Sequence, residues 1–450
     1  MEKFFKLKEN NTDVRTEVTA GVTTFLAMVY ILAVNPNILS AAGMDSAAIF
    51  TATAISAAFA TLIMAFYANY PVALASGMGL NAYFAYSVCI PMAEQGINDP
   101  WKIALAAVLC EGIVFILLSF TNFREKLVNE IPQNLKTGIT AGIGMFIALV
   151  GLKGAGIVIG SESTLVDMGH VGTPQFVLAV VGFIIIAVLN HYNVQGHILI
   201  GILATWILGM IAQAVGWYQV DVEAGVFSLF PSFHGGFLPS KMNFFSFDFA
   251  WIGGHVVEFI TIIFSFLFVD IFDTVGTLIG VASKGGLLDE EGKLPRAKQA
   301  LLADAIGTCA GACMGTSTVT SYVESSAGVV AGGRTGLTSL TTGVLFILAL
   351  FLSPIFLAIP GFATTPALLW VGLLMVSSIK NLDFDSDVAD AVAGFLAFIM
   401  MPFTYSIANG IMFGMISWVL IKLFTGKFKE ITGIMWICFV LFGLRIWTLM

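Results

Sequence analysis

Charged residues are scarce in this sequence. Only 11% of its 450 residues are Asp, Glu, Lys or Arg, and 58% are hydrophobic, whereas soluble domains carry about 25% charged residues. Apolar runs of roughly 20 residues, the length that crosses about 30 Å of hydrocarbon, recur from Gly21 onwards. These features exclude an ordinary soluble protein and predict an all-α polytopic membrane protein.

Several motifs that carry enzyme or metal chemistry are also missing. The sequence has no HExxH, Walker loop, paired CxxC or GxSxG motif, and nothing in it supports nucleic-acid binding. Cys309 and Cys313 lie one helical turn apart without a nearby histidine or second cysteine pair, so we interpret them as small packing residues. The polar start MEKFFKLKENNTDVRTEV lacks the features of a cleaved signal peptide. We expect no enzyme, no metal and no cofactor.

Hydropathy predicts fourteen membrane segments. In the first half they cover 19–36, 46–68, 72–88, 101–120, 137–152, 174–190 and 197–216. In the second half they cover 255–281, 298–314, 320–333, 335–358, 365–379, 387–403 and 407–424. A further apolar stretch, 431–449, follows the fourteenth segment, and we expect it to be an appendage.

The basic residues predict the orientation of these segments. With a cytoplasmic N-terminus, most Lys and Arg of the loops, including Arg124 and Lys126, fall on the cytoplasmic side. Only Lys102, Lys153 and Lys241 fall outside, and Arg445 lies in the terminal stretch. Since cytoplasmic loops are enriched in Lys and Arg, we expect a multi-pass protein of the cell membrane with its N-terminus in the cytoplasm.

The segments divide into two halves. Seven precede the connection at 217–254 and seven follow it, and halves with an odd number of spans insert with opposite topology, as in inverted-repeat transporters. YNVQGHILIGILATW at 192–206 can be laid on YSIANGIMFGMISW at 405–418, which matches Tyr192 with Tyr405 and Gly201 with Gly414. The pattern favours a seven-plus-seven inverted repeat.

The third and tenth segments interrupt the apolar pattern at corresponding positions. PVALASGMGLNAYFAYSV carries Gly77, Gly79 and Asn81, and TSTVTSYVESSAGVVAGG at 316–333 carries Glu324. Unwound backbone frees N–H and C=O groups that hydrocarbon cannot satisfy, so they must face a cavity. A matched pair of interrupted segments indicates the binding site of a transporter, although close packing of helices through small residues is the alternative.

Acidic residues lie inside the predicted spans. Asp270 and Asp273, three residues apart in FSFLFVDIFDTVGTLIG, share a helix face, and each would cost on the order of 2.5–3.5 kcal/mol at the bilayer centre. The spans that hold these two aspartates and Glu324 contain no Lys or Arg to neutralise them, so protons or a cation must do so. Asp304 and Glu111 could join such a relay, but we interpret them as bonded structural groups or helix-end residues.

Three motifs together carry a family resemblance: ASGMGLNAYFAY, FVDIFDTVGTLIG and GTSTVTSYVESSAGVVAGGRTG. The sequence resembles the adenine/guanine/hypoxanthine permeases, the azaguanine-type branch of the nucleobase–cation symporter-2 (nucleobase–ascorbate transporter) families, over nearly its entire length. The resemblance implies a core domain and a gate domain, with short strands in the interrupted third and tenth segments and a purine between them. It carries function onto Asn81, Asp270, Asp273 and Glu324.

These implications fix a predicted domain organisation. The core domain comprises 1–120 and 255–358, the gate domain comprises 121–216 and 359–424, 217–254 connects the halves, and 425–450 is the C-terminal appendage. The resemblance implies a purine nucleobase and a proton, alternatively sodium, as partners within the lipid bilayer, and it leaves a homodimer open.

The residue types also suit a purine. Carboxylates accept from its N–H groups, and an amide such as that of Asn81 both donates and accepts. Aromatic side chains could stack on its faces; they are Phe268, Phe272, Tyr83, Phe84 and Tyr322. We expect Asn81, Asp273, Glu324, Gly79, Phe84 and Phe268 to bind substrate and Asp270 to carry the coupled proton.

The hypothesis is therefore a proton symporter that imports purine nucleobases, with guanine and hypoxanthine favoured because their N1–H can donate to a carboxylate. One alternative is an anion transporter of the same architecture, although a cluster of acids opposes it. Another is an intramembrane aspartyl protease that uses Asp270 or Asp273, although the paired interrupted segments favour transport.

Overall fold

The computed structural model of the chain describes residues 2–120, 130–161, 163–220, 227–231, 242–289, 294–385 and 387–449. Arg124, Lys126 and Lys241, which contribute to the predicted orientation, lie outside these residues. In the described part, nine helical stretches are long and apolar enough to cross a membrane. They are 14–42, 46–68, 100–119, 133–154, 174–191, 197–214, 336–356, 361–381 and 407–424. The fold is that of an all-helical polytopic membrane protein, as predicted, whereas the count of fourteen segments stays a prediction.

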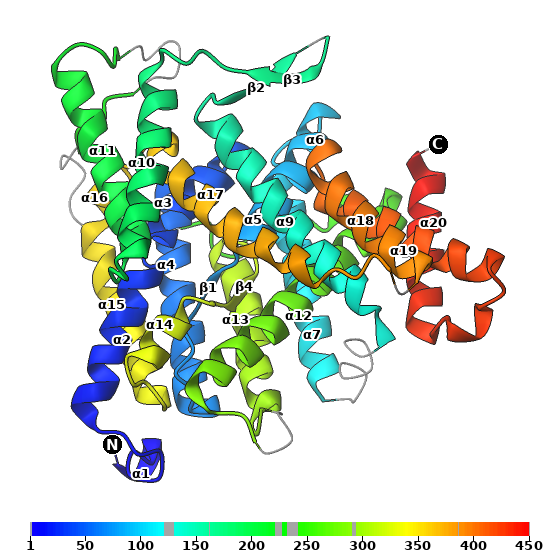
Figure 1. Cartoon of the computed structure of the whole chain (residues 1–450), viewed down its shortest axis with the longest axis horizontal. Helices are drawn as coiled ribbons and strands as arrows, with labels where there is room; N and C mark the ends of the chain where they lie inside the picture. The colour runs from blue at the N-terminus through cyan, green and yellow to red at the C-terminus, as the bar shows by residue number, and fades with distance from the viewer. Residues whose placement is uncertain are drawn as a thin grey trace.

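One set of helices surrounds the middle of the molecule in the lower and left parts of Figure 1. These helices are α2 (Val14–Met28), α3 (Ile31–Leu39), α4 (Ser46–Ile63), α7 (Pro100–Ser119), α12 (Val256–Gly285), α13 (Ala297–Met314), α14 (Ser325–Val330) and α15 (Gly336–Ala349). α4 packs against α13 and α15, α2 packs against α14 and α15, and α7 packs against α12 and α13. Elements from both halves of the sequence thus form one packed unit.

A second set of helices packs mainly within itself. Its members are α9 (Gln133–Gly154), α10 (Pro174–His191), α11 (His197–Ala214), α17 (Gly361–Val376), α18 (Val388–Phe403) and α19 (Ile407–Phe424). α9 lies between α17 and α18. Glycine has no side-chain carbon, and a Cβ added at Gly138 would lie only 2.2 Å from the Gly394 carbonyl oxygen. A Cβ added at Gly144 would lie 2.8 Å from the Gly372 carbonyl oxygen. Small residues thus let these helices approach closely, as in membrane helix pairs.

Smaller elements complete the chain. They are α1 (Glu2–Phe5), α5 (Met78–Ala82), α6 (Ile90–Glu94), α16 (Ser353–Phe356), a hairpin of β2 (Val158–Ser161) and β3 (Leu165–Met168), and α20 (Gly433–Leu449). α20, which is the predicted appendage, packs against both α19 and α12. Its Phe442 ring lies 5.7 Å from that of Phe264 on α12, so the last helix contacts both sets.

The first predicted span, 19–36, contains a turn that the hydropathy pattern does not predict. The structure ends α2 at Met28 and begins α3 at Ile31, with a tight turn at Val29 and Tyr30. The Leu32 and Ala33 N–H groups donate to the carbonyls three residues earlier, which is the spacing of a 3₁₀ turn. The turn brings the Tyr30 side chain into the middle of the molecule.

Both predicted interruptions are present as short strands. β1 (Leu74–Ser76) and β4 (Val319–Ser321) form an antiparallel pair in the middle of the molecule. The third segment then continues through α5 into a π-helical stretch, Tyr83–Cys89, and the tenth continues into α14. The two segments therefore meet through their extended backbone.

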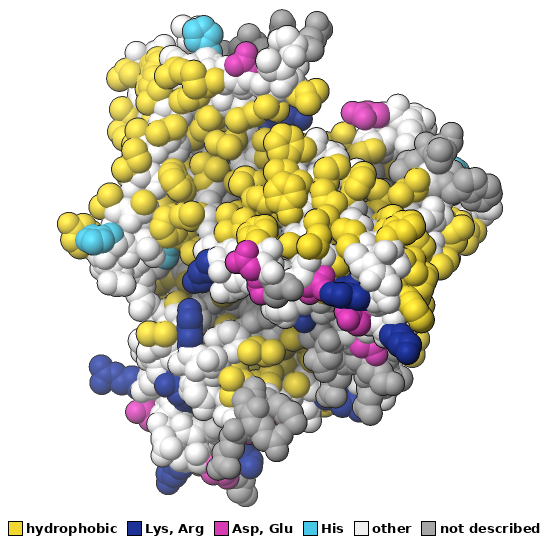
Figure 2. Space-filling view, turned by 45° about the vertical axis from the view of Figure 1, so that its right-hand side comes forward, with side chains coloured by type: hydrophobic (Ala, Val, Ile, Leu, Met, Phe, Trp, Pro, Cys, Tyr) yellow, Lys and Arg dark blue, Asp and Glu magenta, His cyan; other side chains and the backbone are white. Residues whose placement is uncertain are grey.

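The surface supports the membrane assignment. Figure 2 shows hydrophobic side chains over the upper and middle part of one face, and Lys and Arg mostly in its lower part. Exposed apolar residues on the long helices include Leu117 at 61% and Ile184 at 55%. Such a large exposed apolar area is uncommon in soluble monomers and suits contact with lipid.

Candidate functional site

The strand pair is held by backbone bonds on both sides of its three-residue register. The Gly77 N–H donates to the Thr318 carbonyl, and the Tyr322 N–H donates to the Ala73 carbonyl, each at 3.0 Å. A Cβ at Gly77 would lie 2.6 Å from the Thr320 methyl carbon, so glycine permits the strands to approach. Extended backbone is tolerated inside a membrane-spanning fold where it is buried in protein and does not face lipid.

Two of the predicted acids are partly exposed and lie near each other beside the strands. Asp273 of α12 and Glu324, which precedes α14, are both partly exposed, and the two carboxyl groups interact electrostatically. The Tyr30 hydroxyl donates to Glu324 Oε1 at 2.5 Å. Tyr322 lies near both acids, and its hydroxyl donates to the Ser76 carbonyl at 2.5 Å. Acids from two segments thus lie close together next to β1 and β4.

Three other acids are fully buried on α12, α13 and α7. Asp270, Asp304 and Glu111 all have 0% exposure, and each interacts electrostatically with the other two. The Thr274 hydroxyl lies 3.3 Å from Asp270 Oδ1 and 3.0 Å from Asp304 Oδ2. These acids form a second group, which we call the buried acid cluster.

Strand β4 contributes polar side chains to this cluster. The Ser321 hydroxyl donates to Asp304 Oδ1 at 3.0 Å, and the hydroxyl oxygens of Thr320 and Thr274 lie 2.7 Å apart. Tyr322 and Glu324 follow on the same segment. A single short segment therefore connects the partly exposed acids with the buried acid cluster.

Asn81 does not bond to Glu324. It is fully buried, and its Oδ1 accepts from the Ser76 hydroxyl at 2.7 Å. The Ser76 hydroxyl also lies 3.2 Å from that of Thr316, whose Oγ1 accepts from Asn35 at 3.0 Å. Asn81 Nδ2 has no hydrogen-bond partner among the described residues.

The remaining predicted binding residues lie in the packed interior around the strands. Phe84 and Phe268 are 0% and 1% exposed. The Phe84 ring lies 6.4 Å from that of Phe266, and the Phe268 ring lies 4.6 Å from that of Phe272. A Cβ at Gly79 would lie 2.8 Å from the Ile143 methyl carbon on α9, so this glycine lies where the two helix sets meet.

Comparison with known proteins identifies the family of this chain. Residues 15–440 match the permease family described by the Xan_ur_permease profile. The chain belongs to this permease family. It is a transporter and not an enzyme, as the sequence predicts.

Relatives match the permease over almost its full length. A putative permease from Methanocaldococcus jannaschii is 45% identical and covers 99% of this chain and 98% of its own. The guanine/hypoxanthine permease PbuO of Bacillus subtilis is 44% identical, with 99% and 100% covered. The adenine permease AdeP of Escherichia coli is 42% identical, with 99% and 96% covered.

Solved structures share the fold at low sequence identity. The transmembrane domain of the cyanobacterial bicarbonate transporter BicA has a TM-score of 0.65 at 13% identity, covering 88% of this chain and 97% of that one. The murine anion transporter Slc26a9, in its inward-facing state, has a TM-score of 0.65 at 12% identity, covering 91% and 68%. At this identity the likeness concerns the fold alone.

Two residues of the site, Tyr30 and Glu111, differ from what the sequence predicts. Tyr30 contacts Glu324 across 294 positions, and no local pattern predicts such a contact. Asp304 is hydrogen-bonded, as interpreted from the sequence. Glu111, by contrast, does not show the hydrogen bonds of a bonded structural group, because neither of its carboxylate oxygens has a hydrogen-bond partner among the described residues.

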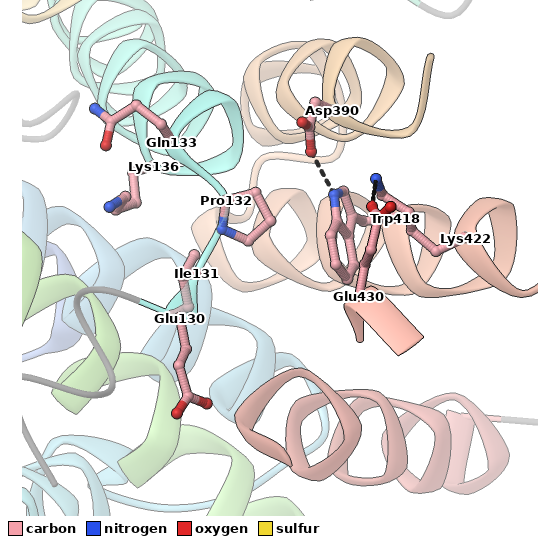
Figure 3. A pocket seen from close by; sticks show the side chains of 9 residues that line it. All are labelled: Glu130, Ile131, Pro132, Gln133, Lys136, Asp390, Trp418, Lys422 and Glu430. Atoms are coloured by element: carbon pink, nitrogen blue, oxygen red, sulfur yellow. Dashed lines mark hydrogen bonds and ion pairs between the residues drawn. The ribbon is translucent and has the colours of Figure 1, made fainter. Parts of the chain in front are cut away.

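A separate surface cavity of about 410 Å³ lies at the ends of α9, α18 and α19 (Figure 3). Trp418 donates to Asp390 at 2.5 Å, and Lys422 donates to Glu430 at 2.5 Å. Lys422 also donates to Asp387 at 3.0 Å. These bonds tie α18, α19 and the turn before α20 together, and we interpret the cavity as a product of this structural network.

Proposed function

We propose that this permease imports purine nucleobases in symport with protons, and that it prefers guanine and hypoxanthine. The observation that carries the proposal is the set of relatives named as adenine or guanine/hypoxanthine permeases. Four of them are 40% to 44% identical and cover 98% or 99% of this chain. Similarity over the full length supports a shared class of substrate.

The two partly exposed acids suit the polar edge of a purine. Asp273 and Glu324 offer carboxylate oxygens to ring N–H groups, and charge-assisted hydrogen bonds of this kind are strong. Tyr30 orients Glu324 by donating to one of its oxygens. We assign substrate contact to Asp273 and Glu324, with Asn81 supplying a further amide donor from Nδ2.

The other assigned residues shape the site around the strands. Phe84 and Phe268 would stack on the faces of the base, which requires a side-chain rearrangement because both rings are buried here. Gly79 would allow the gate helix α9 to close against the third segment.

The preference for guanine and hypoxanthine follows from their N1–H group. This group donates to a carboxylate, whereas adenine has an acceptor nitrogen at the same position. The relatives do not decide between adenine and guanine or hypoxanthine, because permeases named for either kind of substrate have similar sequence identity to this chain.

Coupling to protons is assigned to Asp270. Its carboxyl group is fully buried and lies one turn from Asp273, so its protonation would remove a buried charge during the return step. Sodium is the competing ion because carboxylates, hydroxyls and carbonyls also suit a hard cation.

We further propose that the two helix sets act as core and gate in a fourteen-segment inverted repeat. The core comprises 1–120 and 255–358, and the gate comprises 121–216 and 359–424, with the N-terminus in the cytoplasm. Segments 3 and 10 would form the binding site within the core, as in transporters that use broken helices at the bilayer midplane.

An anion transporter is the second candidate, because the solved structures of similar fold include a bicarbonate transporter. Partly exposed acids next to the strands oppose it, since an anion prefers positive partners.

The test is uptake of radiolabelled hypoxanthine into proteoliposomes, with unlabelled adenine, guanine, xanthine, uracil and bicarbonate as competitors. Guanine and hypoxanthine should compete most strongly, and a pH gradient should drive accumulation. Strong competition by uracil without an effect of purines would overturn the purine assignment, and uptake that requires Na⁺ after the pH gradient is collapsed would overturn proton coupling.

A further inference from the structure

Glu111 differs from the other buried glutamate of the core helices, Glu17. Both are 0% exposed. Glu17 accepts from the N–H groups of Arg334, Thr335 and Thr338 at 2.8, 3.3 and 3.1 Å, and from the Thr338 hydroxyl at 2.7 Å. A buried carboxylate with four donors is stable as an anion. Glu111 has no such donors in the described part of the chain.

The group that Glu111 faces is the carboxyl group of Asp270, which lies close enough to hydrogen-bond it. Asp270 Oδ2 likewise has no donor among the described residues. Two carboxylates both lack a hydrogen, so they can bond each other only when one of them is protonated. Two adjacent buried anions would otherwise repel each other in a medium of low dielectric constant.

The hydroxyl groups nearby cannot replace this proton. Thr274 has one hydroxyl hydrogen, and Asp270, Asp304 and Thr320 all lie within 3.3 Å of its oxygen. The Ser321 hydroxyl is directed to Asp304. The Thr320 hydroxyl also interacts with Asp270. Even so, both Glu111 oxygens and Asp270 Oδ2 have no hydrogen-bond partner in the described part of the chain.

No described basic residue compensates for the charge either. The titratable groups around Glu111 are Asp270 of α12, Asp304 and Cys309 of α13, and Cys110, the preceding residue of its own helix. Neither Glu111 nor Asp270 forms an ion pair with a Lys or Arg in the described part of the chain. A proton is the smallest group that fits between two carboxylate oxygens inside a closed, fully buried space.

We infer that Glu111 and Asp270 share one proton, and that Glu111 is the partner that retains the coupled proton when Asp270 is ionised. The proton lies between an oxygen of Glu111 and Asp270 Oδ2, so the pair carries one negative charge with the proton and two without it. The coupling role rests on the proposed proton symport, whereas the shared proton does not.

The connection to the substrate site runs through β4. Thr320 and Ser321 contact the buried acid cluster, while Tyr322 of the same segment bonds to Ser76 of β1. A shift of β4 when a base binds beside Glu324 would therefore change the surroundings of the shared proton.

Infrared spectroscopy of the purified protein tests the shared proton without any transport. At about pH 8, where carboxyl groups in water are ionised, the wild type should retain the C=O stretching band of a protonated carboxyl group. Glu111→Gln should lose intensity in this band, Glu111→Asp should shift its frequency, and Glu94→Gln, which alters an exposed glutamate, should change nothing. An unchanged band in both Glu111 variants would overturn the inference, and Glu111→Asp alone decides it if Glu111→Gln does not fold.

Transport measurements test the coupling role. Glu111→Gln should lose accumulation of hypoxanthine driven by a pH gradient but retain exchange of hypoxanthine across the membrane, and Glu111→Asp should recover part of the accumulation. Wild-type accumulation in Glu111→Gln would overturn this role. If the wild-type protein does not transport hypoxanthine, the proposed function fails while the infrared result still decides whether the proton is shared.

Discussion

Individual acidic residues in this permease have different surroundings, and these predict different roles. Glu324 is partly exposed and accepts a hydrogen bond from one tyrosine. Glu17 accepts hydrogen bonds from several backbone N–H groups, whereas Glu111 faces another acid. Position within a hydrophobic span is therefore not enough to assign function. The donors around each carboxyl group distinguish a binding residue from a structural residue.

Tyr30→Phe should weaken binding of hypoxanthine. The change removes the hydroxyl that fixes Glu324, and a hydrogen bond to a charged group contributes about 1.5–3 kcal/mol, so we expect a loss of about tenfold or more in affinity. Calorimetry on purified protein measures it. Tyr67→Phe, at a tyrosine that is 54% exposed, is the matched control. Unchanged affinity in Tyr30→Phe would mean that the bond does not orient the binding acid.

Glu17→Gln should destabilise the fold without changing substrate specificity. Glu17 caps the start of α15 through Thr335 and Thr338, and an amide presents N–H groups to donors that need an acceptor. We expect a loss of about 1–3 kcal/mol, seen as a lower midpoint of thermal unfolding in detergent. A midpoint equal to that of Glu94→Gln would show that the cap is dispensable.

Among the elements, most boundaries follow from the sequence. The predicted span at 407–424 coincides with α19, and both short strands lie in the two interrupted segments, because apolar runs and glycines act locally. The turn at Val29 and Tyr30 has no glycine and was not predicted. Contacts such as Tyr30 with Glu324, or Glu111 with Asp270, join distant segments, so hydropathy and local motifs could not reveal them.

The ends of α18 and α19 are joined by an ionic network whose contribution should depend on pH. Lys427 and Lys422 donate to Asp387 at 2.7 and 3.0 Å and hold the pKa of this carboxyl group well below its usual range. Because the folded pKa is lowered, the stabilisation is present above the unfolded pKa of about 3.9 and is lost as the pH falls through the folded pKa.

Asp387→Asn should therefore lower the unfolding midpoint at neutral pH, and the difference from the wild type should narrow below about pH 4. Asparagine caps a helix about as well as aspartate, so the change isolates the ion pairs, and we expect a loss of about 1 kcal/mol. Asp385→Asn, at a neighbouring exposed aspartate, is the control. A difference that stays constant across this pH range would contradict the ionic origin.

At the scale of the whole molecule, the candidate site contains two groups of acids, and both lie next to the strand segments. Asp273 and Glu324 are partly exposed, whereas Asp270 lies in the buried acid cluster. Asp270 and Asp273 are one helical turn apart on α12. The same helix therefore carries the proposed contacts for both the purine and the proton.

This division predicts that binding and coupling can be separated. Asp270→Asn should bind hypoxanthine as the wild type does but fail to accumulate it against a gradient. Asp273→Asn and Glu324→Gln should lose about tenfold or more in affinity, which is about 1.4 kcal/mol, because an amide presents fewer acceptors to purine N–H groups.

The most direct test is calorimetry of hypoxanthine binding to the wild type and these three variants, alongside uptake into proteoliposomes under a pH gradient. We predict normal binding without accumulation for Asp270→Asn, and weak binding for Asp273→Asn and Glu324→Gln. Loss of binding in Asp270→Asn with normal binding in Asp273→Asn would reverse the two roles. Full accumulation in all three variants would contradict the acid-based mechanism.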